Sequence, residues 1–457
     1  MAASLYRLGS VVSTANGAHL GRERSSGWRT VRRRATDDGR PPMGFDVYGL
    51  FDIECGLRVA AENTVRILQE RGQRVVVRSI RPDGRMPRRR TRLRQDINLF
   101  HVNPNWIELM LSRCSPSSLR RSLNVCVVYW ELPRLPCVWL PLLGSMDVLL
   151  APTQFIADSI LASLPEALIV PLPQAVSLPA GVAADRQRFG VPEDATVFCM
   201  SLAADSGIDR KNPWAAVEAF LCAFPDEPDV RLLVRLQQSR EGTTPEIERL
   251  LDVSREDSRV VPVLGELDYR GVLSLYASSD VYVSLHRSEG LGLGPMEAMT
   301  LGKVVVATGW SGNMQFMDDT NSCPVAYKLV ELGVGGPGPY QQDSFTEPVS
   351  WAEPNIEDAA ETMYRLYRDP ELRRELGDRA RESMRSHRQT ASAAQWVDDL
   401  ADARLAIQAD SAAHVARVHE FLLIRRTQQA ARIRAQLRGL GGKLVRSWRR
   451  RRKNAIS

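Results

Sequence analysis

The chain lacks any apolar run long enough to cross a membrane, and it has little cysteine. No uninterrupted apolar stretch in its 457 residues approaches the 18 or so residues that a spanning helix needs. The seven cysteines form no Cys-x-x-Cys pair and are irregularly spaced, which gives no support for a zinc or other metal site. Because most of them lie in apolar runs, we expect reduced, buried thiols and a reducing, cytoplasmic compartment.

Basic residues are scarce in the body of the chain relative to its two ends. Residues 1–43 carry eight arginines against three acids, a charge of about +5, and residues 411–457 carry thirteen Arg and Lys against Glu420 alone, about +12. The net charge of +6 therefore leaves residues 44–410 at about −11. A nucleic-acid-binding protein more often has its basic surface on the folded domain, so nucleic acid is disfavoured as a partner. Basic ends on an acidic body indicate either an anionic membrane surface or solvated tails.

The first 43 residues are predicted to be a disordered basic segment, because Gly, Ser, Arg and Pro dominate them. Two hypotheses account for this segment. Translation could begin at Met43, where a strand-like run opens, or the Arg- and Ser-rich, acid-poor stretch could be a transit peptide. The lack of amphipathic periodicity favours the first hypothesis.

Strand-like runs alternate with helical segments from residue 44 onward, which predicts two α/β units with parallel sheets covered by helices. A Pro- and Ala-rich stretch at 172–190 suits a linker between them. We therefore divide the chain into residues 1–43, 44–188, 189–400 and a basic helical tail, 401–457. The predicted strands are 45–50, 74–80, 96–103, 124–130, 147–151 and 168–170 in the first unit, and 196–202, 230–236, 260–263, 281–285 and 303–307 in the second. The predicted helices are 58–71, 213–224, 295–301 and those within 356–400.

The most informative stretch runs from His286 to Met299, directly after the predicted strand 281–285. Three glycines in five positions let a ligand approach the backbone, and a proline fits the first turn of the helix that follows. The free N–H groups and positive dipole end of that helix suit a diphosphate. Glu289 and Glu297 flank the turn, where carboxylates can accept hydrogen bonds from sugar or ribose hydroxyls. The turn follows a strand, so it should face the ligand crevice of an open sheet.

Two adjacent cations, Arg210 and Lys211, lie between a predicted strand and a predicted helix at the start of the second unit. The charge of a leaving diphosphate grows as a glycosidic bond breaks, so fixed cations stabilise the transition state more than the ground state. The alternative is a solvated helix start, since exposed cations are common.

In the first unit, the turn Trp130-Glu131 follows a strand, and Gly49 and Gly56 lie in the first loop. Trp130 suits the core or a cleft wall better than a sugar-stacking platform. Glu131 either braces its turn or meets substrate. The loop lacks G-x-G-x-x-G, which argues against a dinucleotide cofactor.

The Glu-x7-Glu spacing of Glu289 and Glu297, continued by Ala298-Met299 and Gly302 and then by Ser311-Gly312-Asn313, resembles the signature of the retaining GT-B glycosyltransferases of family 4. The resemblance covers about residues 44–400. It implies the GT-B fold, two facing Rossmann-like domains with the active site between them. Residues 44–188 would form the acceptor domain and residues 189–400 the donor domain.

The resemblance also implies roles for single residues. Glu297 would bind the donor ribose, Glu289 would face the transferred sugar, and Lys211 with Arg210 would hold the donor phosphates. Further donor contacts are expected from Gly292, Leu293, Gly294, His286 and Arg287, and acceptor-side or loop contacts from Gly56, Glu131 and Trp130. Many relatives have a histidine near the Trp130 turn, and this sequence has none there.

The implied reaction is transfer of a hexose, with mannose one candidate, from a nucleotide-diphosphate sugar with retention of configuration. The acceptor would be a glycan, a lipid-linked acceptor or another molecule, in cell-surface polysaccharide or glycoconjugate synthesis, and no obligatory cofactor or metal is implied. The rival hypotheses are a catalytically degenerate nucleotide-sugar-binding scaffold and another GT-B activity such as an epimerase or a phosphorylase. The sequence shows neither an acid/base pair suited to epimerisation nor a pyridoxal lysine.

Two basic segments lie outside these motifs. Residues 81–94 carry seven arginines against Asp83, which would either grip an anionic acceptor such as a lipid diphosphate or form a solvated loop. The C-terminal helix combines apolar residues, arginines and Trp448. Such a helix can lie on anionic lipid, each surface cation contributing about 1 kcal/mol, which would place the protein on the inner face of the plasma membrane. Packing on a partner protein is the competing hypothesis, and nucleic-acid contact ranks third.

Overall fold

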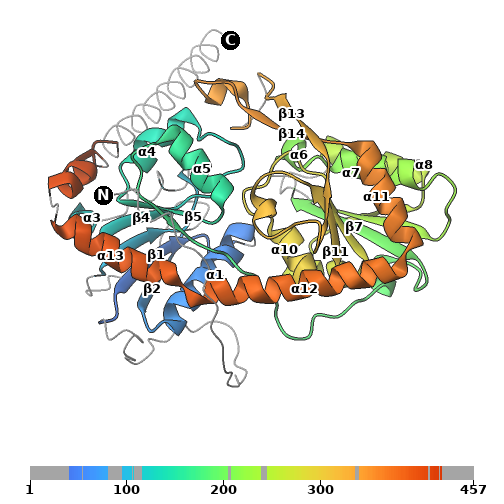
Figure 1. Ribbon diagram of the computed structural model, residues 1–457, viewed down its shortest axis with the longest axis horizontal. Coiled ribbons are helices and arrows are strands. Elements are labelled where there is room, and N and C mark those ends of the chain that lie inside the picture. Colours follow the sequence, from blue (N-terminus) through green and yellow to red (C-terminus); the bar gives the residue numbers. More distant parts are fainter. Residues whose placement is uncertain are drawn as a thin grey trace, which may run out of the picture.

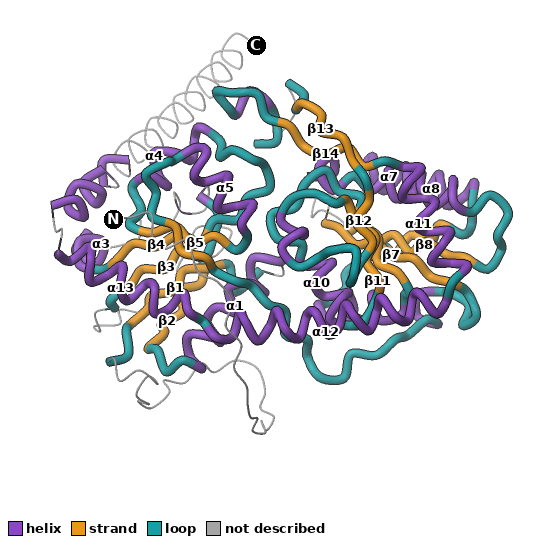
Figure 2. Tube along the Cα trace, viewed as in Figure 1, coloured by secondary structure: helices purple, strands orange, loops and turns teal. Residues whose placement is uncertain are grey.

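The computed structural model describes residues 41–424 except for residues 54, 81–94, 105–106, 108–115, 204–206, 238–243, 335–338, 410–411 and 421. Two α/β domains lie side by side and a long helix, α12, runs along both of them (Figure 1). Figure 2 shows a sheet at the centre of each domain, with helices around it. Residues 1–40 of the predicted basic segment, the arginine-rich stretch 81–94 and most of the tail fall outside the described residues.

The first domain is a six-stranded parallel sheet in the order β2-β1-β3-β4-β5-β6. Four of these strands are buried at every position, as expected where helices cover both faces of a parallel sheet. Its strands are β1 (Gly44–Gly49), β2 (Arg74–Ser79), β3 (Ile97–Phe100), β4 (Leu123–Val127), β5 (Val148–Ala151) and β6 (Ile169–Pro171). Its helices are α1 (Gly56–Glu70), α3 (Pro116–Arg121), α4 (Leu140–Gly144) and α5 (Gln154–Ser163).

The second domain repeats the architecture with the parallel order β12-β11-β10-β7-β8-β9. Its strands are β7 (Thr196–Ala203), β8 (Val230–Gln237), β9 (Val260–Val263), β10 (Val281–Ser284), β11 (Val304–Thr308) and β12 (Cys323–Val325). Its helices are α6 (Ile208–Lys211), α7 (Pro213–Ala223), α8 (Pro245–Glu256), α9 (Tyr269–Ser278), α10 (Leu293–Thr300) and α11 (Ile356–Arg368). The two-domain α/β arrangement predicted from the sequence is confirmed, with most element ends within a few residues of the prediction.

The last helices of the described chain return to the first domain. Helix α12 (Pro370–Ala393) runs from the second domain to the first (Figure 1), and α13 (Gln395–Ala409) then packs against the first domain. Asp398 pairs with Arg71 at 3.0 Å, and Arg404 pairs with Asp96 at 2.7 Å. The boundary predicted at 400/401 falls inside α13, because one amphipathic helix continues through it.

An antiparallel hairpin, β13 (Tyr327–Glu331) and β14 (Ser350–Pro354), rises from the second domain. The described residues between its strands, 332–334 and 339–349, reach toward the first domain on the side of α4 and α5 (Figure 1). The alternation pattern of the sequence did not predict this hairpin, because both strands are short and half exposed.

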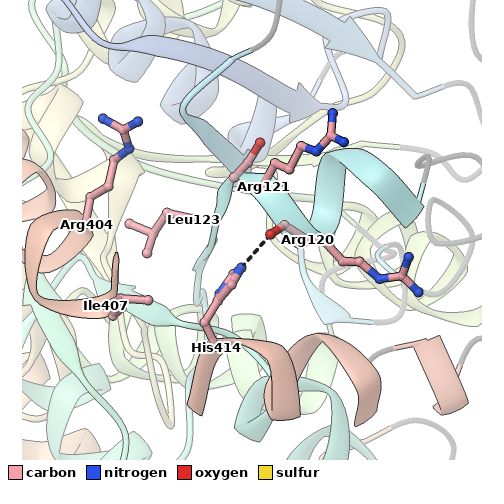
Figure 3. A pocket seen from close by; sticks show the side chains of 7 residues that line it. Arg120, Arg121, Leu123, Arg404, Ile407 and His414 are labelled. Carbon is pink, nitrogen blue, oxygen red and sulfur yellow. Dashed lines mark hydrogen bonds between the residues drawn. The ribbon is translucent and has the colours of Figure 1, made fainter. Parts of the chain in front are cut away.

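A cavity of about 240 Å³ lies at the base of the first domain (Figure 3). Leu123, at the first position of β4, lines it, so it opens at the amino edge of the sheet, away from the strand ends where the predicted site lies. The other lining residues are Arg120, Arg121, Ser122, Arg404, Ile407 and His414.

No helix within the described ranges is long and apolar enough to span a bilayer. The six described cysteines are free thiols; Cys126, Cys199 and Cys323 are buried and Cys222 is exposed. Burial raises the pKa of the Cys199 thiol to about 12, so this side chain acts as a small apolar group.

Candidate functional site

The glycine-rich loop joins β10 to α10 at the carboxyl end of the second sheet. Gly292 precedes α10 with a φ of +86°, a left-handed conformation that glycine adopts without strain. The helix begins at Leu293, two residues before the predicted start, and Pro295 lies in its first turn. The loop and helix therefore present an N-terminus with unsatisfied N–H groups, as the sequence predicted.

Close packing explains two of the glycines. A Cβ on Gly294 would lie 2.3 Å from the Tyr282 hydroxyl, and a Cβ on Gly290 would lie 2.5 Å from the backbone oxygen of Trp130. The second contact joins the two domains directly. Gly56, at the start of α1, faces the same loop from the first domain, because its added Cβ would lie 3.1 Å from Leu293 Cδ1. The structure therefore brings Gly56 and the donor loop together.

Glu289 lies at the centre of the candidate site, with its side chain only 7% exposed. Its carboxylate pairs with Lys211 Nζ through Oε1 and with Arg210 Nη1 at 3.4 Å through Oε2. Burial raises the pKa of Glu289, but the charges of Lys211 and Arg210 outweigh burial and lower it to about 2. Glu289 is therefore a carboxylate at any physiological pH.

Arg210 is buried and connects both domains. Its Nη1 donates a 2.7 Å hydrogen bond to the backbone oxygen of Ser288, and its Nη2 lies 3.7 Å from Glu131 Oε1 in the first domain. Although burial lowers its pKa, the Glu131, Tyr340 and Glu289 groups raise it above the ordinary value, so the guanidinium stays charged. The structure thus places Arg210, Lys211, Glu131 and Glu289 in one cluster.

Glu297 projects from α10 and is also buried, but it has a different partner. Its Oε1 accepts a 2.9 Å hydrogen bond from the Tyr269 hydroxyl of α9. Burial raises the pKa of Glu297 to about 7, and the hydrogen bond from Tyr269 only partly offsets that effect. The two carboxylates of the Glu-x7-Glu pair therefore differ in electrostatic character: one is held ionised by cations, and the other is ready to take up a proton near neutrality.

His286 and Arg287 differ in how close they lie to this cluster. His286 is fully buried near Glu289 and Lys211, and its burial lowers its pKa to about 4, so it is a neutral imidazole. Arg287 points to the hairpin instead: its guanidinium binds Glu353 at 2.6 Å and lies over the Trp351 ring at 5.4 Å. Arg287 thus uses its charge to hold β14.

Trp130 is 1% exposed and packs edge-on against Trp139, with 4.7 Å between the ring centroids. Its indole Nε1 donates to the backbone oxygen of Arg134. The structure accordingly places Trp130 in the hydrophobic core. Its neighbour Glu131 braces the contact between the domains, since its backbone oxygen accepts a hydrogen bond from the Ser288 hydroxyl.

Sequence reasoning missed several residues that shape this site. Tyr269 binds Glu297, Tyr340 binds Glu131, and Thr153 donates a 2.9 Å hydrogen bond to the Gly290 backbone oxygen across the domain boundary. His101, at the carboxyl end of β3, is buried against the Thr64 hydroxyl at 3.0 Å. A polar residue at the carboxyl end of a buried strand was the available signal for His101. The others depend on contacts between segments far apart in the sequence.

A family model described as "Glycosyl transferases group 1" matches residues 214–323. The match includes Glu289 and Glu297 and begins just after Lys211. No curated protein matches the chain.

Solved structures show the fold. Sucrose-phosphate synthase from Thermosynechococcus elongatus (14% identity) and a glycosyltransferase from Rickettsia africae (13%) each align with a TM-score of 0.55 over 79% of this chain, covering 100% and 98% of their own. HepE from Anabaena, in complex with UDP and glucose, aligns with a TM-score of 0.52 at 14% identity, over 79% of this chain and 100% of its own. Of another neighbour, S. aureus TarM, the chain covers only 55%.

These alignments and the two parallel sheets confirm the GT-B fold class. The family match within that fold supports transfer of a glycosyl group from a nucleotide sugar, and hence a glycosyltransferase.

Proposed function

We propose that the protein is a retaining glycosyltransferase of family 4 type that transfers a hexose from a nucleotide-diphosphate sugar to a glycan or lipid-linked acceptor. The observation that carries the proposal is the cluster of the partly buried Lys211 with the buried Arg210 and Glu289, on the loop that leads into α10 and on the neighbouring α6. Two cations and a helix N-terminus at the carboxyl end of a parallel sheet suit a diphosphate. A buried carboxylate held ionised next to them suits the hydroxyls of a sugar.

In the proposed mechanism, Lys211 and Arg210 bind the diphosphate and stabilise the charge that grows on it as the glycosidic bond breaks. The acceptor hydroxyl attacks the anomeric carbon on the face from which the diphosphate departs, and its proton passes to a donor phosphate oxygen. Glu289 accepts hydrogen bonds from the transferred sugar. Glu297, on the next turn of the same segment, accepts them from the ribose.

The ion pairs of the cluster also bear on donor binding. Lys211 and Arg210 are neutralised by Glu289 and Glu131, and the buried Arg210 in particular needs such a partner. A diphosphate supplies two negative charges in their place and allows Glu289 to turn to the sugar. The site is therefore already ordered before the donor arrives, which limits the entropy lost on binding.

The first test is a screen of donor binding by thermal shift with UDP-, GDP- and ADP-sugars, on the wild type and on Glu297→Ala. A ligand at a hundredfold its dissociation constant stabilises the fold by about 2.7 kcal/mol, which is readily measured. We expect one nucleotide to stabilise the wild type and not the variant. If no nucleotide shifts the melting temperature of the folded wild type, the proposal fails.

Turnover separates the enzyme from a nucleotide-sugar-binding scaffold. With the donor from the screen, release of the nucleoside diphosphate is measured in the presence of candidate glycan and lipid-linked acceptors. An enzyme loses release in Glu289→Ala while it still binds the donor. A scaffold binds the donor and shows no release in either form.

We further propose that the basic tail holds the protein on an anionic membrane surface at the cytoplasmic face. Residues 412–420 should be kept in the test, because Val418 is buried and His414 contacts Asp147 at 3.0 Å. The comparison is therefore the full chain against a variant with glutamine at Arg449–Arg452 and Lys453. Vesicles with anionic lipid should sediment the first and not the second; equal sedimentation contradicts the proposal.

A further inference from the structure

Between β13 and β14, the described residues 332–334 and 339–349 bring side chains of the second domain into the first. Leu332, Phe345 and Val349 are buried in a hydrophobic cluster whose other members come mainly from the first domain. Glu347 pairs with Arg134 of the first domain. The hairpin therefore joins the two domains in addition to the linker, α12 and the contacts of the glycine-rich loop (Figure 1).

Tyr340 lies on this segment and touches both halves of the candidate site. Its ring stacks on Trp130 with 5.4 Å between the centroids and 5° between the planes. Its hydroxyl donates a 2.9 Å hydrogen bond to Glu131 Oε2. The Arg210 guanidinium carbon lies 5.5 Å from the ring centroid, within the range of a cation–π contact.

The backbone opposite Tyr340 leaves room for its ring. Gly207, just before α6, has a φ of +84°, and a Cβ there would lie 3.2 Å from the Tyr340 ring. A side chain at Gly207 would meet both a strained backbone and this ring. Because α6 carries Arg210 and Lys211, the Tyr340 ring packs directly on the element that presents the two cations.

The hydroxyl of Tyr340 limits how the Glu131 carboxylate can pair with Arg210. It occupies Oε2 of that carboxylate, while the other oxygen stays 3.7 Å from Arg210 Nη2, longer than a hydrogen bond. Glu131 therefore does not form a bidentate pair with Arg210, a pair that would compete with a phosphate for the guanidinium. Tyr340 thus covers one face of the Arg210 guanidinium. It also restrains Glu131, the carboxylate that would compete with a phosphate for Arg210.

We propose that Tyr340 is a positioning residue for Arg210: it holds the guanidinium toward the donor phosphates and keeps Glu131 from pairing with it fully. This inference rests on the proposed donor site. Because a nucleoside diphosphate carries a second phosphate and more negative charge than the monophosphate, Tyr340, acting through Arg210, contributes to the preference for the diphosphate. Residues 339–349 thereby link contact between the domains to the orientation of the cation.

Calorimetric titration of the full chain with UMP, UDP, GMP and GDP tests this. The variants are Tyr340→Ala, Tyr340→Phe and the double variant Tyr340→Phe/Glu131→Gln. Tyr327→Ala, at a 41% exposed tyrosine of β13, is the control on the same hairpin. Melting temperatures without nucleotide show which variants remain folded.

We expect Tyr340→Ala to weaken diphosphate binding by about tenfold, the size of a desolvated cation–π contact, with monophosphate binding unchanged. Tyr340→Phe should also weaken diphosphate binding, because Glu131 is released to pair with Arg210. The double variant should bind the diphosphate as well as wild type. The control should behave as wild type.

The proposal is overturned if Tyr340→Ala binds the diphosphate as well as wild type, or if both nucleotides weaken by the same factor, as a merely structural role would give. Failure of the double variant to recover binding overturns the restraint on Glu131. If wild type prefers no diphosphate at all, the proposed donor site fails as well, so the same titrations distinguish the two failures.

Discussion

Replacement of Glu297 by glutamine should stabilise the unliganded protein at alkaline pH while it impairs donor binding. Glu297 is buried, and its only described hydrogen bond comes from the Tyr269 hydroxyl. Glutamine has the same shape, and its side-chain oxygen can still accept that bond. The substitution therefore removes the ionisable carboxyl group and keeps the side-chain shape and the hydrogen bond from Tyr269.

The magnitude follows from the pKa of Glu297, about 7 in the folded chain against an ordinary value of 4.5. A carboxyl group whose pKa is raised by folding contributes stability that is complete below the unfolded pKa and is lost as pH rises through the folded pKa. A shift of this size corresponds to about 3 kcal/mol at 1.36 kcal/mol per pH unit. Glu297→Gln should therefore match wild type at pH 4.5 and exceed its free energy of unfolding by up to about 3 kcal/mol at pH 8.

Urea denaturation of both proteins at pH 5 and pH 8, without nucleotide, measures the difference. Glu218→Gln, at an exposed position of α7, is the matched control and should show no such gap. A gap that does not grow with pH would refute the assignment of the raised pKa to Glu297. In the proposed role the ionised carboxylate accepts ribose hydroxyls, so nucleotide affinity of the wild type should also rise between pH 6 and pH 8.

Three further outcomes are expected. Glu289→Gln should lower transfer by about 100-fold or more, the usual size for a group that stabilises the transition state, and leave diphosphate binding in place, as nucleotide release and calorimetry would show; retained transfer would contradict the role. Gly290→Ala should impair both turnover and melting temperature, because its Cβ would lie 2.5 Å from the Trp130 oxygen, whereas Gly333→Ala, with nothing within 4 Å, should be neutral. The hydrogen bond to Asp147 raises the pKa of His414, so its contribution is present at low pH and lost as pH rises through that raised pKa. Hydrogen exchange of residues 412–420, corrected for the intrinsic rate, should increase between pH 6 and 8.5, and less so in His414→Gln.

Local patterns in the sequence were sufficient for the two sheets and for the donor loop. Mostly apolar runs such as 96–103 and 124–130 predict strands of a buried parallel sheet, and the glycines around Leu293 with Pro295 predict the loop and helix start. These features depend on residues close together in the chain. The same holds for the Glu289 and Glu297 pair, eight positions apart on one loop and helix.

The hairpin β13–β14 and Tyr340 could not be predicted in this way. Their stability comes from burial of Phe345 and its neighbours against a domain encoded two hundred residues earlier, and no local period reports such a contact. Arg287 shows that proximity in the sequence can also suggest the wrong partner. Its place beside Glu289 in the sequence suggested a donor contact, yet the guanidinium turns to Glu353 because a carboxylate on β14 is within reach.

The sequence analysis assigned Arg210, Lys211 and Glu289 to the donor, and in the structure these residues are paired with one another. The charges of the site explain this arrangement. Arg210 and Glu289 are both buried, and an uncompensated charge at either place would cost several kcal/mol. Among the described residues, the carboxylates that pair with Arg210 are Glu289 and Glu131. Under the proposed function, a diphosphate would replace them because it brings the same charge to the same donors. Donor binding would then have to release Glu289 before this carboxylate could meet the sugar.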